Sequence, residues 1–299
     1  LDVAIKRRHL RDFEFDLERL TASGFPHEVR MLTREETRAA TGTDAYIGAL
    51  LNMGNGHLHP LNLCVGEARA AVSRGATIFE QSPVIRIEHG SRPKVLTDSG
   101  TVSADAVILA GNAYHHLERK LRGVMFPVRS FIVATEPLPD DVVAQINPHD
   151  YAICDPNFVL EYFRLSTDKR LLFGGRLNYF GDDPNVIARK HRRKIARHYP
   201  QLADVRIDYA WGGTIGVPLT RVPIMGRISP NVFYSQGYSG HGVNVTHLAG
   251  QILADAVAGT MERFDLFADV KPTMVPGAHL FSKPLVALGV LYYQVRDRL

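Results

Sequence analysis

The chain has 299 residues, of which 45% are hydrophobic and 22% are charged, as in an ordinary folded globular protein. Its formal net charge of +4 is too small to indicate a nucleic-acid-binding protein, so no nucleic-acid partner is expected. Cys64 and Cys154 are the only cysteines, which excludes a disulfide scaffold, a zinc ribbon and an iron–sulfur framework. The length is typical of two domains of about 150 residues each.

Two lone thiols suit a reducing compartment, and we therefore expect a cytoplasmic protein. No stretch reaches the roughly 18–20 apolar residues that span a bilayer, so membrane insertion is not expected. The apolar residues 285–293 fit a short C-terminal helix better than a membrane contact. The chain begins with Leu1 and has no signal-peptide pattern, and we expect it to be part of a longer protein.

The first fifty residues have a polar pattern that predicts helices. One buried helix face is indicated by apolar residues at helical spacing, namely Leu10, Phe13, Leu17 and Leu20. Thr33 followed by Glu36 is the pattern of a capping box, in which the two residues satisfy backbone N–H groups at the start of a second helix.

A glycine-rich turn at residues 52–59 leads into a third predicted helix, with Pro60 at its first position and Gly75 at its end. One face of this helix carries Leu61, Val65, Ala68 and Val72. Short strands are predicted next, at residues 77–80, 84–88, 94–97 and 101–103. Residues 105–110 are almost continuously apolar, which is typical of a parallel strand buried on both faces.

The middle of the chain has a different pattern. Half-buried antiparallel strands are predicted from alternation at residues 128–135, 159–166, 170–174 and 205–211. A helix is predicted from Asp183 to Tyr199, and its charged residues 189–194 are interpreted as a solvated face. A strand at 232–236 and a helix at 243–258 then return to the earlier pattern. An α/β layer interrupted by an antiparallel insertion predicts two domains built from discontinuous segments.

The strongest single motif is a glycine-rich loop between this last strand and helix. It consists of Gly237, Tyr238, Ser239, Gly240, His241 and Gly242. Glycines let the backbone approach a ligand closely, and a helix start offers N–H groups with partial positive charge. The loop therefore predicts a site for a phosphate, a carboxylate or a polarised carbonyl oxygen. Its G-x-x-G-x-G spacing differs from the dinucleotide fingerprint, and a turn that only packs the helix explains it nearly as well.

Several short motifs recur in the order of a known family. They are G-H-L-H-P at 56–60, G-A at 75–76, S-P-V at 82–84, A-D-A-V-I-L-A-G at 104–111, V-R-S at 128–130, A-T at 134–135, Y-F-R at 162–164, G-G-R at 174–176, W-G-G at 211–213, R-V-P at 221–223 and G-Y-S-G-H-G at 237–242. With these motifs the chain resembles the flavin-dependent D-amino-acid oxidase/sarcosine oxidase superfamily. Within it, the γ-glutamylputrescine oxidase-like branch is the most similar.

The resemblance implies an α/β fold, α+β overall, in which an incomplete FAD-binding Rossmann-like domain is interleaved with an antiparallel β-sheet substrate domain. It assigns residues 54–127 and 222–265 to the FAD-binding domain, residues 1–53 and 128–221 to the substrate domain, and residues 266–299 to a C-terminal tail. The family's N-terminal G-x-G-x-x-G unit, which cradles the pyrophosphate, does not occur in this sequence. We therefore expect a truncated sequence, whose tight binding of FAD depends on that unit.

The resemblance also implies the residues that bind FAD. It places the flavin pyrimidine edge beside residues 240–244, and the adenine beside Val84. The full implied set is Gly56, His57, Val84, Ala110, Gly111, Gly237, Tyr238, Ser239, Gly240, His241, Gly242, Val243 and Asn244. Some relatives tether the flavin through a cysteine near residues 221–226. This chain has none there, so we expect non-covalent FAD.

The implied reaction is oxidation of the C–N bond of a primary or secondary amine, either a polyamine derivative or an amino acid. The hydride would pass to the flavin, and oxygen or another acceptor would take the electrons. The implied substrate pocket contains Tyr162, Arg164, Trp211 and His59. Asn244 occupies the place of a lysine in sarcosine oxidases, which favours an amine over a simple α-carboxylate. The alternatives are a flavin dehydrogenase that reduces a quinone or carrier, and a truncated chain without activity.

Each of these pocket residues also has a purely structural interpretation. Tyr162 and Arg164 fit equally well the polar side of an amphipathic strand in water, and a tryptophan such as Trp211 is by default a core residue. His57 and His59 have no carboxylate or cysteine nearby at ligand spacing, so no metal is expected.

Overall fold

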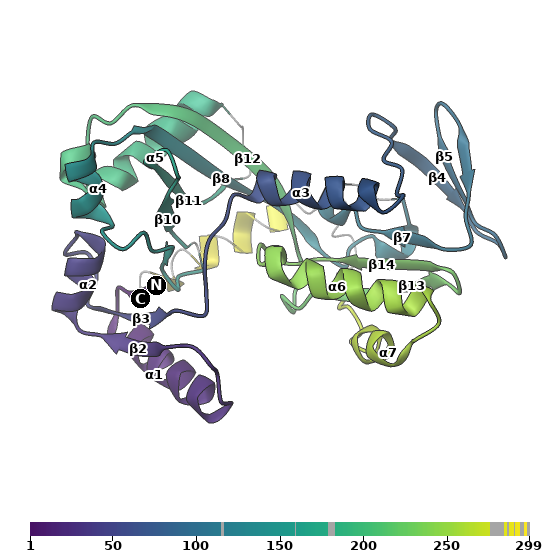
Figure 1. The fold of residues 1–299 in the computed structure, drawn as a ribbon, viewed down its shortest axis with the longest axis horizontal. Helices are drawn as coiled ribbons and strands as arrows, with labels where there is room; N and C mark the ends of the chain where they lie inside the picture. The colour runs from purple at the N-terminus through teal and green to yellow at the C-terminus, as the bar shows by residue number, and fades with distance from the viewer. Residues whose placement is uncertain are drawn as a thin grey trace. The chain divides into compact units, whose positions relative to one another are not determined.

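The structure is a computed structural model that describes residues 1–114, 117–158, 160–178, 183–275, 284–285, 287–289, 291–293 and 296–297. Figure 1 shows its helices and strands, which belong to two compact units. Unit 1 comprises Leu1–His57, Arg129–Gly213 and Leu288–Leu299, and unit 2 comprises Leu58–Val128 and Thr214–Ala287. Parts of two predicted elements lie outside the described residues. These are Val159 of the strand at 159–166, and residues 276–283, 286, 290, 294–295 and 298–299 of the tail at 266–299.

Unit 1 is built on a sheet with the strand order β12-β8-β11-β10-β9-β1-β3-β2 (Figure 1). Its strands are β1 (Asp2–Ala4), β2 (Val29–Leu32), β3 (Gly48–Asn52), β8 (Phe126–Pro137), β9 (Ile153–Cys154), β10 (Tyr162–Leu165), β11 (Arg170–Asn178) and β12 (Ile207–Val217). β10 pairs antiparallel with β9 and β11, and β11 pairs antiparallel with β8. The antiparallel pairing predicted for the middle of the chain is therefore confirmed.

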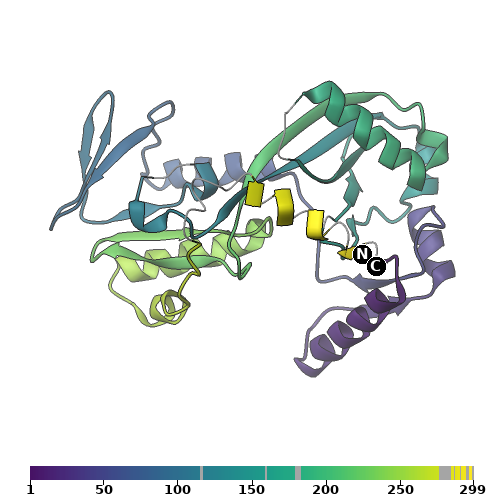
Figure 2. The same cartoon turned by 180° about the vertical axis from the view of Figure 1, so that it is seen from behind.

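Helices cover parts of both faces of this sheet (Figure 2). They are α1 (Arg7–Ala22), α2 (Arg34–Thr41), α4 (Asp140–Ile146) and α5 (Pro184–His198), followed by the 3-10 turn η3 (Pro200–Leu202). The main core forms where Ile187 and Ile195 of α5 pack with Phe163 and Phe173 of the sheet. On the strands β1 and β3, a smaller cluster forms around Phe13 of α1. Burial of each such side chain stabilises the fold by roughly 1.5–3 kcal/mol.

The helical interpretation of the first fifty residues is only partly right. The capping box is confirmed, because Glu36 N donates to Thr33 Oγ1 and Thr33 N donates to Glu36 Oε2. The strands β1, β2 and β3 correct the rest, because they lie before, between and after the two helices. They are three to five residues long, and β1 pairs in part with β9, far along the chain. The helical spacing of apolar residues in this segment gives no information about pairing between strands that are far apart in the chain.

The charged run at 189–194 is not a uniformly solvated face. His191 is fully buried, and its Nδ1 lies 3.0 Å from the carbonyl oxygen of Ile187. Lys194 forms an ion pair with Glu161 at 2.7 Å. Ile187, Ile195 and Tyr199 are buried on the same side of the helix. Because a helix repeats every 3.6 residues, one residue of any such run faces the core whatever its polarity.

Unit 2 contains two three-stranded sheets in its described part, together with three longer helices. One sheet has the order β13-β14-β7, with β7 (Val107–Leu109), β13 (Ile224–Ser229) and β14 (Val232–Gln236). The other consists of β4 (Val84–Glu88), β5 (Lys94–Thr97) and β6 (Thr101–Ser103). The helical elements are α3 (Pro60–Ser73), η1 (Asn112–Tyr114), η2 (Arg119–Leu121), α6 (Gly242–Val257) and α7 (Glu262–Ala268). β14 pairs parallel with β7 and antiparallel with β13.

Three expectations for unit 2 are corrected. Residues 77–80, which are described, lie in no strand, and Phe79 is 71% exposed. Within the apolar run at 105–110 only Val107–Leu109 is a strand, and Ile108 is exposed rather than buried on both sides. Helix α3, which is described in full, has no buried residue, and its apolar face is exposed. Sequence periodicity shows that residues share a face, but it does not show whether that face is covered.

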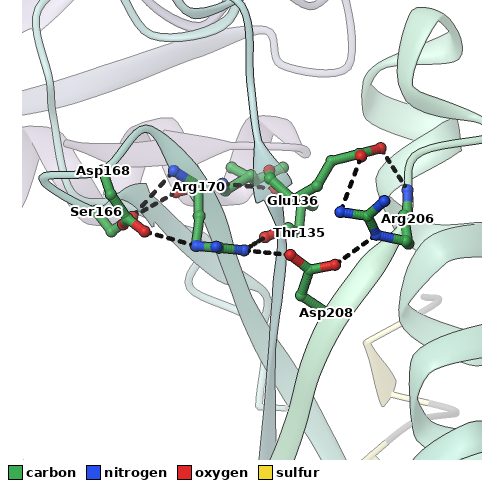
Figure 3. A network of polar contacts seen from close by, with 8 residues as sticks. Thr135, Glu136, Ser166, Asp168, Arg170, Arg206 and Asp208 are labelled. Carbon is green, nitrogen blue, oxygen red and sulfur yellow. Dashed lines mark hydrogen bonds and ion pairs between the residues drawn. The ribbon is translucent and has the colours of Figure 1, made fainter.

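A network of ion pairs joins three strands of unit 1 near their ends (Figure 3). Arg170 of β11 donates to Asp168 and to Asp208 of β12, each at 2.6 Å, and to the carbonyl oxygen of Thr135 on β8. Arg206 donates to the other carboxylate oxygen of Asp208 at 2.6 Å. Hydrogen bonds from Arg206 and Arg170 lower the pKa of Asp208. These hydrogen bonds join β8, β11 and β12, so the cluster acts as a clamp on strand ends.

Candidate functional site

The ends of two neighbouring parallel strands form the candidate site in unit 2. β14 and β7 pair in register, with Tyr234 opposite Leu109, so both strands end at the same edge of the sheet. Ala110 and Gly111 follow β7, and the glycine loop follows β14. In open α/β sheets, ligands bind outside the carboxyl ends of parallel strands, where loops and helix starts converge. Predicted residues that are over a hundred positions apart thus lie at one edge.

The glycine loop has positive backbone φ angles that residues with a side chain rarely adopt. Gly237 and Gly240 have φ angles of 79° and 86°, and Ser239 has a φ angle of 54°. A Cβ atom at Gly237 would also lie 2.6 Å from Cγ of Pro218. Gly237 and Gly240 are therefore required by the shape of the loop.

Hydrogen bonds from several segments hold the loop. Gly237 N donates to Oδ1 of Asn112 at 3.0 Å, and Ser239 N donates to the carbonyl oxygen of Gly216 at 2.9 Å. The hydroxyl of Ser239 donates to the carbonyl oxygen of Arg221, and the hydroxyls of Tyr238 and Ser235 lie 2.6 Å apart. Burial raises the pKa of Tyr238, and the bond to Ser235 acts in the opposite direction.

The loop leads directly into helix α6. Gly242 is the first residue of the helix, and among the described residues no side chain caps the N-terminus at His241. The first turn contains no acidic residue, and Val243 and Asn244 are exposed. A helix start of this kind presents backbone N–H groups with partial positive charge to an oxygen-rich ligand.

The other predicted cofactor residues are more scattered. Val84 starts β4 and packs against the cluster that contains Leu109 and Tyr234. Gly56 is exposed, and no described atom lies within 4 Å of a Cβ placed on it. His57 belongs to unit 1 and Val84 to unit 2, so the structure does not bring these two together in one unit.

Tyr162 and Arg164 project from β10 on the side opposite the core. Phe163 and Leu165 alternate with them and belong to the main core. The Tyr162 ring lies over the bare backbone of Gly174, because a Cβ there would be 2.3 Å from the ring. Its hydroxyl lies 3.3 Å from that of Ser130. Burial raises the pKa of Tyr162, and the bond to Ser130 offsets part of this.

Arg164 and His57 lie side by side in unit 1. Arg164 donates to the carbonyl oxygen of Leu165 at 2.9 Å and lies 3.4 Å from Nδ1 of His57. Nε2 of His57 lies 2.9 Å from the carbonyl oxygen of Asp150, which requires the hydrogen on Nε2. Burial lowers the pKa of Arg164, and the nearby charge of Asp150 acts in the opposite direction.

Trp211 is not the core residue that its default interpretation suggests, and His59 has a structural role. Trp211 on β12 is 45% exposed and so is not a core tryptophan. The next residue, Gly212, faces Phe131, whose ring would lie 2.6 Å from an added Cβ. His59 is the N-cap of α3, where its Nδ1 accepts a hydrogen bond from Asn62 N at 3.2 Å. This gives His59 a defined structural task in unit 2.

Sequence reasoning did not identify Asn112, Ser130 and Gly216, which contact the predicted residues. A partial signal existed for Asn112, because asparagine after a strand end tolerates the left-handed backbone that it adopts here, with a φ angle of 48°. In the residues that the structure describes, no group of three or more His, Cys, Asp or Glu side chains is placed to hold a metal ion. None of the described helices has the length and apolar character that crossing a bilayer requires.

A glycine loop at parallel strand ends, followed by a helix start, defines a class of protein that binds a cofactor rich in oxygen or phosphate groups. The family model of FAD dependent oxidoreductases matches residues 2–256. The chain therefore belongs to the family of FAD-dependent oxidoreductases and is an enzyme. The family, the cofactor and the oxidoreductase activity predicted from the sequence are confirmed.

Relatives with curated functions share the whole length of the chain. Gamma-glutamylputrescine oxidoreductase of Escherichia coli K12 is 39% identical over 301 aligned positions, which cover 100% of this chain and 70% of that protein. A probable oxidoreductase named OrdL from Rhizobium meliloti is 38% identical with the same coverage. Glycine oxidase from Geobacillus kaustophilus is a similar solved structure, with a TM-score of 0.77 at 21% identity. That match covers 91% of this chain and 73% of the other, and it confirms the mixed fold.

Proposed function

We propose that the enzyme oxidises the C–N bond of a primary or secondary amine, either a polyamine derivative or an amino acid. The observation that carries this proposal is the glycine loop at the ends of β7 and β14, held by Asn112, Gly216 and Ser235 and continued into α6. The substrate class is supported by the 39% identity to a gamma-glutamylputrescine oxidoreductase along the whole chain.

The residues of unit 2 fit the flavin end of FAD. The first turn of α6 provides N–H donors without a carboxylate beside them, which suits the oxygen-bearing pyrimidine edge. Gly240 and Gly242 allow the close approach that this contact requires. In the proposal the adenine lies beside Val84, and the linker lies beside Ala110 and Gly111. The stretch 221–226 contains no cysteine, which supports non-covalent binding.

FAD supplies the acceptor for the hydride that leaves the carbon next to the amine nitrogen. The task of the protein is to bind and orient the amine and to exclude water. The partly buried ring of Tyr162 favours the neutral form of an amine bound beside it, which is the reactive form. We assign substrate contact to Tyr162, Arg164 and Trp211. We include His59 in the proposed substrate pocket as well, and its Nδ1 also caps α3. Asn244 supports a substrate without a simple α-carboxylate at that position.

A visible absorption spectrum of the purified protein tests the proposal. Flavin bands that bleach on anaerobic addition of an N-acylated putrescine or a similar amine are the expected result. Absence of flavin bands both from the 299-residue chain and from a chain that includes a G-x-G-x-x-G unit overturns the FAD site, whereas bands that no amine bleaches overturn the substrate class. Oxygen consumption without an added acceptor then separates an oxidase from a dehydrogenase that requires a quinone or carrier.

The proposal includes oxygen or another small acceptor and a cytoplasmic location. In the described residues Cys64 and Cys154 are free thiols, which supports a reducing compartment. Fluorescence microscopy of a tagged chain tests the location, and a signal concentrated at the cell envelope contradicts it.

A further inference from the structure

Asn112 connects the two strand ends of the candidate site. It is the first residue of η1, directly after β7 and Gly111. Its Oδ1 accepts the hydrogen bond from Gly237 N at 3.0 Å, and Gly237 is the first residue of the glycine loop after β14. The bond thus joins the segment that follows one parallel strand to the loop that follows its neighbour.

The backbone of Asn112 and its surroundings are adapted to this bond. Its φ angle is 48°, in the left-handed region that asparagine adopts more readily than most residues. A Cβ atom on Gly216 would lie 2.6 Å from Oδ1 of Asn112, so the amide occupies space that only a glycine leaves open. Gly216 also accepts the hydrogen bond from Ser239 N through its carbonyl oxygen. Asn112, Gly216 and the loop therefore pack as one unit.

Gly237 is buried, so its N–H group depends on a partner within the protein. The Asn112 carbonyl satisfies it without bringing a charge to this edge of the sheet. A carboxylate at position 112 could accept the same hydrogen bond from Gly237 N. It would, however, place a negative charge near the start of α6, where the flavin ring lies in the proposed function. Alanine would leave the N–H group unpaired, and loops with unpaired buried groups rearrange.

We propose that Asn112 is a positioning residue that holds the glycine loop in the conformation that binds the flavin. This inference rests on the proposed placement of FAD at the loop. Asn112 acts through Gly237 and does not itself contact the substrate. The loss of its side-chain acceptor is expected to weaken FAD binding about tenfold, the effect of losing one buried hydrogen bond.

Three substitutions separate the acceptor from the backbone conformation. Asn112→Gly keeps the left-handed backbone and removes the side-chain acceptor. Asn112→Asp keeps the backbone conformation and the acceptor, and adds a negative charge. Asn112→Ala removes both. Hydrogen exchange of the amides at 237–242 is measured in the protein without FAD, and the FAD dissociation constant and the flavin reduction potential are measured by titration. Asn231→Ala is the matched control, because Asn231 donates to the carbonyl oxygens of Gly90 and Ser91 before the same strand, β14.

We expect faster loop exchange and weaker FAD binding in the glycine and alanine variants. Asn112→Asp should restore slow exchange and lower the flavin reduction potential. If Asn112→Gly keeps the exchange and FAD affinity of the wild type, or if Asn231→Ala changes both as much, the inference is overturned. Exchange that changes as expected in a protein that binds no FAD, even when a G-x-G-x-x-G unit is included, would support the loop contact and overturn the proposed FAD site instead.

Discussion

At the scale of single residues, Tyr162 keeps its position because Gly174 on the neighbouring strand has no side chain. The two residues are direct cross-strand partners, and an added Cβ would meet the Tyr162 ring at 2.3 Å. We predict that Gly174→Ala displaces the ring, raises KM for the amine and lowers the stability of the fold by about 1–3 kcal/mol, the usual result of overpacking. Steady-state kinetics and thermal unfolding check both effects.

Tyr162→Phe is the control for this experiment. It keeps the ring in place and removes only the bond to Ser130. The FAD content of both variants should equal that of the wild type, because both changes lie in unit 1. An unchanged KM and melting temperature in Gly174→Ala would show that the Tyr162 ring does not lie over Gly174.

The first residue of α6 supports a second prediction at this scale. A Cβ on Gly242 would lie 3.3 Å from Cβ of Tyr238, and the branched side chain of valine would extend further into the loop. We therefore predict that Gly242→Val abolishes flavin retention, as read from the ratio of flavin to protein absorbance after gel filtration. Gly250→Val is the matched control on the same helix, because no described atom lies within 4 Å of a Cβ there. Flavin loss in both variants would point to a general weakening of α6 rather than to the loop.

The glycine loop was predictable from sequence, but the residues that hold it were not. The loop combines a strand, three glycines and a helix in one local segment, and each part has its own signature. The partner of Gly237 is Asn112, which lies 125 positions earlier in the chain. The contacts of Tyr162 with Ser130 and Gly174 were not predictable either, because they depend on strand register. A single sequence contains no record of such pairings.

At the scale of elements, a half-buried carboxylate ties α5 to the segment before β10. Glu161 accepts hydrogen bonds from Lys194 at 2.7 Å and from His198 at 2.8 Å, and its side chain is 22% exposed. Burial alone would raise the pKa of Glu161, but the bond from His198 and the charge of Lys194 outweigh it and lower the pKa to about 2. The neighbouring Asp155 is shifted in the other direction, because burial raises its pKa to about 6.

These shifts predict opposite pH dependences. The folded-state pKa of Glu161 lies below its ordinary value of 4.5, so its stabilisation is complete above pH 4.5 and is lost as the pH falls toward 2. The folded-state pKa of Asp155 lies above its ordinary value of 3.8, so its ionisation costs stability above pH 6, and this cost disappears as the pH falls toward 3.8. Acid unfolding is therefore expected mainly below pH 4.5.

We predict that Glu161→Gln destabilises the protein by about 2 kcal/mol at pH 7, less than the roughly 3–5 kcal/mol of a fully buried pair because water reaches the carboxylate. The difference from the wild type should shrink as the pH falls below 4.5. Urea unfolding at pH 7, 5 and 3.5 measures it. Glu28→Gln removes one partner of an exposed ion pair with Arg30 and should have little effect. A difference between Glu161→Gln and the wild type that stays constant with pH would exclude a paired carboxylate.

Elements with strong local signals were predictable, whereas those that depend on distant partners were not. Helix α5 has Asp183 as a cap that accepts a hydrogen bond from Asn185 N, followed by a proline and a clear apolar face. The strands β1, β2 and β3 are short, and β1 is stabilised by pairing with both β3 and β9. Such strands form because they pair with neighbouring strands of the sheet. The intrinsic preference of their own residues for the β conformation contributes little.

At the scale of the whole molecule, the order of short motifs along the chain indicated the family, and the match over residues 2–256 confirmed it. No motif indicated how much of each helix's apolar face is buried by other elements. Helix α6 has a buried side with Ala249, Ile252 and Leu253, as its pattern suggests. Helix α3 has an equally regular apolar face, but Leu61, Val65 and Val72 are 65%, 39% and 52% exposed. An apolar face on a helix therefore becomes buried only where another element packs against it.

The exposed face of α3 supports the last prediction. Contiguous apolar surface binds the dye ANS, whereas the same side chains contribute little to stability when they are not buried. We predict that the 299-residue chain binds ANS in its folded state, and that changing Leu61, Val65 and Val72 together to serine reduces the fluorescence without lowering the melting temperature. Leu266→Ser on α7, where the side chain is 73% exposed, is the control for loss of a single exposed apolar residue elsewhere. A lower melting temperature in the triple variant would mean that the α3 face is packed in solution, and unchanged fluorescence would mean that the dye binds elsewhere.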